Sequence, residues 1–153
     1  MNDIAVATVL HVLGVVWWIG GLALITTVVL PQLRRDPANA LESFHAIERR
    51  FAPQVRTAVL IVGASGGWLL YRLQLYRVLD EPGLWWLPAM IALWALFFLM
   101  LFVLGPIGVL RRIMSGPLDH DVASRLARMH YLHAVLLIVA LVIVAGAVAG
   151  NHG

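Results

Sequence analysis

Four long runs of apolar residues follow one another along the chain, separated by shorter polar or charged segments. Each run has about 20 residues or more, which as a helix is long enough to cross the hydrocarbon core of a bilayer. We therefore predict an all-α integral membrane protein, a four-transmembrane-helix bundle that forms one transmembrane domain over residues 1–153. The predicted spans are 4–30, 55–75, 84–104 and 130–150.

Arginines gather in the two connections that would lie on the same side of the membrane. Positively charged loops tend to stay in the cytoplasm, so we predict that both the N-terminus and the C-terminus are periplasmic. The protein would then be a multi-pass protein of the bacterial cytoplasmic (inner) membrane. The arginines of these two connections are Arg34, Arg35, Arg49, Arg50, Arg56, Arg111, Arg112, Arg125 and Arg128, whereas Arg72 and Arg77 lie on the other side.

The first of these connections has an amphipathic pattern over residues 37–52. Leu41, Phe44, Ile47 and Phe51 recur at helical spacing and give this cytoplasmic segment an apolar face. We predict a helix that lies on the membrane surface or runs into the second span, with a bend at Pro53.

The amino-acid composition excludes several classes of protein and of reactive side chain. Hydrophobic residues make up 61% of the chain and charged residues 12%, against roughly 25% charged in a soluble domain. Cysteine is absent, which excludes disulfides and thiolate ligands, and every cationic side chain is arginine, which excludes lysine Schiff bases. The arginines flank apolar spans instead of forming a patch with polar aromatics, so we expect no nucleic-acid partner.

His11 is an ionisable residue inside the first apolar run. A histidine at this depth is costly and usually has a partner or a task, and Gly14 and Trp18 share its helix face. Met90 lies at the same predicted depth in the third span, and His152 follows the outer end of the fourth. Imidazole and thioether suit haem iron as an axial pair and also suit copper(I).

Each of these residues also has a purely structural interpretation. His11 would hydrogen-bond a backbone or serine group, and Met90 would fill space in the core. Gly63 and Gly67 form a GxxxG pair in the second span. That pair either allows close helix packing or leaves room for a flat ligand beside a bare backbone.

A second group of histidines is expected near the cytoplasmic face. His130 and His133 are three residues apart, so they share a helix face, and His45 on the amphipathic connection could approach them. They are either interfacial residues that contact headgroups or a second metal or haem site. A site here and a site at His11 would place one cofactor in each leaflet.

Three segments resemble known families. Leu10-His11 with Trp18, Gly20-Gly21 and Pro31 resembles the first helix of the membrane domain of copper-resistance protein D and of the bacterial oxygen-independent protoporphyrinogen oxidase family. Glu48-Arg49-Arg50 leading to Gly67-Trp68-Leu69-Leu70 resembles the second helix of both. Trp86-Leu87-Pro88-Ala89-Met90 resembles the start of the third helix of the oxidase family.

The resemblance implies that His11 binds haem b. It also implies copper handling, through the other family. At the third-helix position where the oxidase family has an essential lysine, this chain has Met90.

We therefore expect a haem b-binding membrane protein, with one haem or two, that has a redox or electron-transfer role. A quinone or a periplasmic redox protein would be its partner, and if it is an enzyme it would be a haem-dependent membrane oxidoreductase. The alternatives are a copper-binding or copper-exporting membrane protein, with His11, Met90 and His152 as ligands, and a non-catalytic membrane subunit or scaffold. Small-residue faces in spans two and four would allow a homodimer.

Overall fold

The first apolar run forms one continuous helical stretch, Asp3–Arg35, in a computed structural model that describes residues 2–35, 39–106 and 122–150. It consists of α1 (Asp3–Leu24), a π-helical turn η1 (Ile25–Val29) and α2 (Leu30–Arg35). The side chain of Asn2 caps its start by accepting a hydrogen bond from the Ile4 amide at 2.7 Å. At the π-helical turn, Thr26 Oγ1 donates a hydrogen bond to the Leu22 carbonyl at 2.7 Å. This bond gives the buried Thr26 hydroxyl a partner within its own helix.

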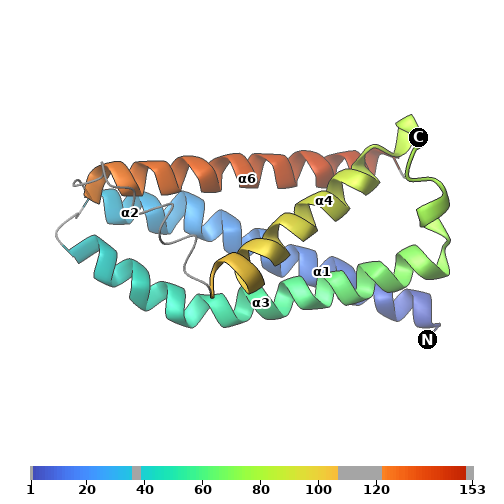
Figure 1. The fold of residues 1–153 in the computed structure, drawn as a ribbon, viewed down its shortest axis with the longest axis horizontal. Coiled ribbons are helices and arrows are strands. Elements are labelled where there is room, and N and C mark those ends of the chain that lie inside the picture. Colours follow the sequence, from blue (N-terminus) through green and yellow to red (C-terminus); the bar gives the residue numbers. More distant parts are fainter. Residues whose placement is uncertain (1, 36–38, 107–121, 151–153) are drawn as a thin grey trace.

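The next helix, α3 (Ala40–Arg72), joins the amphipathic segment to the second apolar run without a break. Pro53 lies inside it and cannot donate a backbone hydrogen bond, so the helix tolerates a bend there. Figure 1 shows α3 bending between its two ends. The described part of the predicted amphipathic connection is therefore the first third of α3, whereas residues 37 and 38 lie outside the described residues.

The third and fourth runs form the remaining long helices. Two short 3-10 turns, η3 (Leu75–Arg77) and η4 (Pro82–Leu84), connect α3 to α4 (Trp86–Phe98), which continues through the π-helical segment η5 (Leu99–Leu104). The last helix is α6 (Val122–Gly150). Within the described residues the chain is helical apart from turns and short connections, with no strand.

Three of these helical stretches are long and apolar enough to cross a membrane, as expected for an all-α membrane protein. They are Asp3–Arg35, Trp86–Leu104 and Val122–Gly150. The stretch that holds the second predicted span, α3, does not meet the same hydropathy test among the described residues. Arg56, Arg72 and the small residues Gly63-Ala64-Ser65-Gly66-Gly67 lower its hydropathy.

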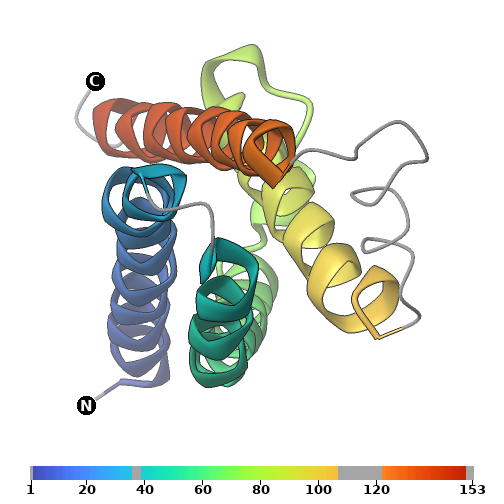
Figure 2. The same cartoon turned by 90° about the vertical axis from the view of Figure 1, so that its left-hand side faces the viewer.

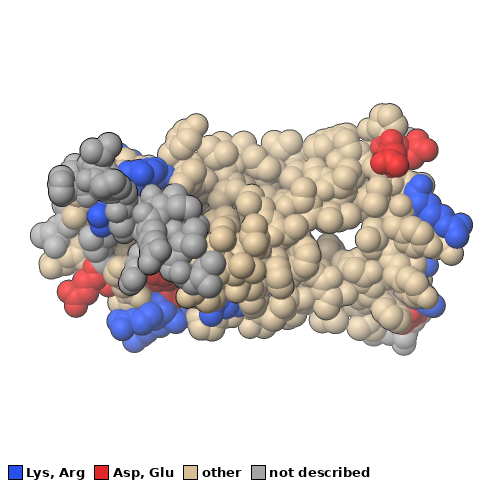
Figure 3. Space-filling model, viewed as in Figure 1, with Lys and Arg blue, Asp and Glu red and all other residues tan. Residues whose placement is uncertain are grey.

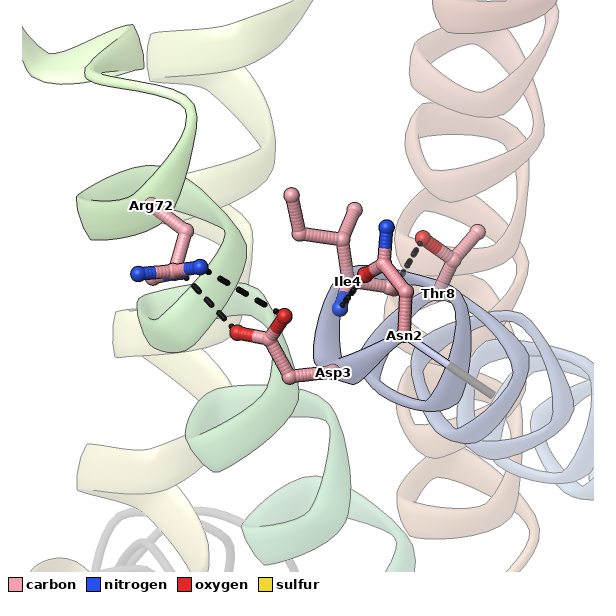
Figure 4. A network of polar contacts seen from close by, with 5 residues as sticks. All are labelled: Asn2, Asp3, Ile4, Thr8 and Arg72. Atoms are coloured by element: carbon pink, nitrogen blue, oxygen red, sulfur yellow. Dashed lines mark hydrogen bonds and ion pairs between the residues drawn. The ribbon is translucent and has the colours of Figure 1, made fainter.

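The helices form a bundle in which α1 and α3 lie side by side and α6 runs above them (Figures 1 and 2). The helix α4 crosses the bundle obliquely and contacts α6 and α3. The start of α1 and the end of α6 lie at the same end of the molecule (Figure 1). At that end, the carboxylate of Asp3 pairs with Arg72 at the end of α3, with Nε and Oδ2 2.9 Å apart (Figure 4).

All four long helical stretches contribute to one central core. Its buried members are Trp18, Leu22, Ala58, Val59, Val62, Leu93, Phe97, Leu137, Ala140 and Ile143. Large apolar side chains also cover much of the outer surface, such as Leu13, Val16 and Ile138 at 61%, 64% and 61% exposure. In the face shown in Figure 3 the charged residues gather at the two ends, with an uncharged belt between them. An apolar belt with charged ends matches a bilayer environment.

Candidate functional site

His11 lies in the interface between α1 and α3. Its Nδ1 is 3.1 Å from the Val62 carbonyl oxygen and 3.3 Å from Ser65 Oγ. The Ser65 hydroxyl donates to the Ile61 carbonyl at 2.5 Å. Because a carbonyl only accepts, Nδ1 carries the proton and donates it to Val62, and the Nε2 lone pair stays available.

Gly66 makes room for the His11 ring. A Cβ placed on Gly66 would lie 2.8 Å from Cε1 of the ring, 3.1 Å from Nδ1 and 3.9 Å from Nε2. The ring edge thus lies against the bare backbone of α3, and Nε2 is the most distant of these three atoms. Among the residues that the structure describes, Nε2 has no hydrogen-bond partner.

The sequence predicted the type of hydrogen-bond partner of His11, but not the individual residues around it. The sequence allowed a backbone or serine partner for the imidazole, but it named neither Val62, Ser65 nor Gly66. Ser65 was the available clue, because it is a hydroxyl residue within an apolar run. Burial of its side chain at 6% exposure shows that it faces a neighbouring helix.

Gly14 and Trp18, which share the helix face of His11, have different surroundings. Gly14 is buried, and a Cβ there would lie 2.8 Å from Val62 Cγ2, so this glycine brings α1 close to α3. Trp18 is 5% exposed and packs edge-on against Phe97, with ring centroids 4.8 Å apart. Its buried Nε1 has no hydrogen-bond partner within residues 2–35, 39–106 and 122–150.

The GxxxG pair of α3 divides into a filled position and an open one. A Cβ at Gly63 would collide with the indole of Trp94, whose Nε1 donates to the Val59 carbonyl at 2.9 Å. Beside Gly67 no such atom of a described residue lies within 4 Å. A side chain of the protein, and not a ligand, therefore occupies the space that Gly63 leaves, whereas Gly67 is exposed and lies on the outer surface of the bundle.

Met90 is partly buried and packs against the central core, to which Val62 also belongs. No hydrogen bond or ring contact joins it to His11 in the described part of the chain. Met90 and Val62, the hydrogen-bond acceptor of His11, therefore belong to the same core. His152, the third predicted ligand, lies outside the described residues.

The second histidine group does not converge on one point. Nδ1 of His130 accepts from Arg34 Nη1 at 3.2 Å, and Nδ1 of His133 donates to the Met129 carbonyl at 2.8 Å. His45 is exposed and contacts Glu48, with Nδ1 and Oε2 3.3 Å apart. Over residues 2–35, 39–106 and 122–150, no three His, Cys, Asp or Glu side chains are grouped as a metal site would require.

The fold and the apolar belt define the class of protein: a helical bundle with helices that can cross a membrane. In comparisons with protein-family models, curated proteins and solved structures, the chain matches none.

Proposed function

We propose that this chain binds haem b in the bacterial cytoplasmic membrane, with Nε2 of His11 as an axial ligand. The observation that carries the proposal is the hydrogen bond from His11 Nδ1 to the Val62 carbonyl. Metal-ligating histidines almost always donate their other ring N–H to a carbonyl, a carboxylate or water, which fixes the tautomer and the ring orientation. His11 has this arrangement within an apolar span, where an imidazole is otherwise costly.

The surroundings supply part of a cofactor site. Gly67 offers bare backbone on the exposed face of α3, and Trp18 Nε1 is a buried donor that has no partner among the described residues. Figure 3 shows an opening through the bundle in the half where α1 begins and α6 ends. Met90, on the same core, is our candidate for the second axial ligand. Gly14 and Gly63 contribute to helix packing instead.

The proposed role is redox or electron transfer with a quinone or a periplasmic protein. Haem would supply the one-electron chemistry, and the chain would set its potential. Val62, through its carbonyl, would raise the basicity of His11. The apolar core around Val59, Leu93 and Phe97 would exclude water from the site.

We further propose that α3 also crosses the membrane and that both termini are periplasmic. The helix α3 lies beside α1 and ends next to the start of α1, where Asp3 and Arg72 pair, so it runs back across the same distance. At the opposite end lie Arg34, Arg35 and Arg49, and an arginine-rich end favours the cytoplasm.

A non-catalytic membrane subunit or scaffold is the second candidate, and it rests on a separate observation. Aromatic side chains in α4 and directly before it lie against glycines of the neighbouring helices: Trp94 against Gly63 of α3, and Trp85, which precedes α4, against Gly146 of α6. Such packing stabilises a bundle without any cofactor. Copper bound by His11, Met90 and His152 remains the alternative metal.

The reduced-minus-oxidised absorption spectrum of the detergent-purified protein, produced in haem-replete cells, tests the proposal. Wild type should show a Soret band, His11→Ala should lose it, and the exposed-histidine control His45→Ala should keep it. If His133→Ala loses about half of the band, a second haem is bound at that end. Metal analysis of the same samples separates copper from haem. A wild-type preparation with neither haem nor copper overturns the proposal and favours the scaffold.

A further inference from the structure

Two adjacent arginines of α3, Arg49 and Arg50, line an open recess on the surface of the bundle. Its volume is about 410 Å³, and among the described residues Ala46 and Ile47 also line it. Both arginines are exposed, and neither guanidinium makes an ion pair or a hydrogen bond with another described residue. The neighbouring carboxylate of Glu48 is in contact with His45 on the same helix turn. Among the described residues, no carboxylate pairs with either of these two cations.

The recess lies at a defined depth. Arg50 precedes Val55, the first residue of the apolar part of α3, by five positions, which is roughly 8 Å along a helix. The polar headgroup layer extends about 5–8 Å beyond the hydrocarbon core on each side. Where the apolar part of α3 lies in the bilayer core, the guanidinium groups of Arg49 and Arg50 lie among the lipid phosphates.

The helix segment that carries the two arginines is held firmly against the bundle. Phe44, Ile47 and Phe51 pack with the buried cluster of Ile25, Leu30 and Met129. The Phe51 ring lies so close to Gly21 of α1 that a Cβ there would be 2.5 Å from it. The recess is thus a fixed feature, with an apolar floor beside its two cations.

We propose that this recess binds an anionic phospholipid of the cytoplasmic leaflet, such as phosphatidylglycerol, through its phosphate. A guanidinium fork binds phosphate oxygens in a bidentate manner, and Ala46 and Ile47 contact the apolar part of the same lipid. A soluble phosphate would use the cations but not the apolar floor, so the structure favours the lipid. The proposal does not depend on haem at His11, but its choice of leaflet rests on the orientation proposed above.

Native mass spectrometry of the detergent-purified protein, titrated with phosphatidylglycerol or phosphatidylcholine, tests the proposal. Each arginine near an anionic surface contributes a factor of about five in binding, so R49Q/R50Q should bind phosphatidylglycerol about 25-fold more weakly. The control R35Q/R77Q removes two exposed cations elsewhere and should bind like wild type. R49K/R50K keeps the charge but loses the fork, so its affinity should be intermediate.

Three results would overturn the proposal. The first is equal binding of phosphatidylcholine and phosphatidylglycerol by wild type. The second is an equal loss in R49Q/R50Q and R35Q/R77Q, which would show that only total charge matters. The third is displacement of the lipid by millimolar inorganic phosphate, which would identify a soluble-phosphate site. The far-UV circular dichroism of each variant checks that it is folded. Phosphatidylglycerol binding by wild type should also weaken as the salt concentration rises, because salt screens the attraction between the arginines and the phosphate, and this measurement needs no substitution.

Discussion

Alanine at Gly63 and alanine at Gly67 should have opposite effects on stability, although the two positions are four residues apart on the same helix. At Gly63 the new methyl group would collide with the Trp94 indole. Overpacking of this kind costs about 1–3 kcal/mol. Displacement of the ring also weakens the hydrogen bond from Trp94 Nε1 to Val59, worth about 0.5–1.5 kcal/mol.

Helix propensity works in the other direction at both positions. Replacing glycine by alanine inside a helix gains about 0.8–1 kcal/mol. The net cost of Gly63→Ala is then about 0.5–3.5 kcal/mol. Gly67→Ala meets no atom within 4 Å and should be stabilising by up to about 1 kcal/mol.

The assay is unfolding of the purified protein in mixed micelles with increasing sodium dodecyl sulfate, followed by far-UV circular dichroism. A double-mutant cycle sharpens it, because in a Trp94→Ala background the ring that obstructs Gly63→Ala is gone. In that background Gly63→Ala should cost nothing or stabilise. If Gly63→Ala is neutral in the wild-type chain, or Gly67→Ala is equally destabilising, Trp94 does not occupy the space at Gly63 and the packing argument fails.

Two further substitutions test the ends of the α1–α3 interface. Gly66→Ala should push the His11 ring away from α3, because its Cβ would lie 2.8 Å from Cε1, and should weaken the bond to Val62. Overpacking and the weakened bond, less the gain in helix propensity, should lower stability by about 0.5–3.5 kcal/mol in the same unfolding assay. The Soret absorbance should fall as well, and an unchanged spectrum would contradict the position assigned to His11. Asp3→Asn removes the ion pair with Arg72, whose side chains are about 45% exposed. The loss of stability should stay below about 1 kcal/mol and become smaller in high salt, because solvent and salt screen exposed ion pairs. A larger loss would contradict the exposure of this ion pair.

Periodicity and hydropathy were sufficient to predict the helices. Apolar runs favour helices in any membrane setting, and the helical fold with helices able to cross a membrane is confirmed. The second predicted span, 55–75, was less distinct, since Arg56 and the glycine run of α3 lower its hydropathy. Local pattern also placed His11, Gly14 and Trp18 on one face, and that face does meet α3 and the core.

What local pattern did not supply was the identity of the facing residue. A glycine pair such as Gly63 and Gly67 indicates a close approach, but the crossing of α4 over α3 decides that Trp94 is the group that approaches. The same holds for His130 and His133. They share a helix, yet the position of Arg34 on α2 gives one an arginine partner, while the other binds its own helix backbone.

The arrangement of α4 also has a consequence for the order of assembly. Gly63 precedes Trp94 in the chain, so this pair can form as soon as α4 follows α3 into the membrane. Gly146 belongs to the last helix and meets Trp85 only when α6 arrives. Until then the indole of Trp85 lacks this contact. Its packing against Gly146 would then fix the position of the last helix in the bundle.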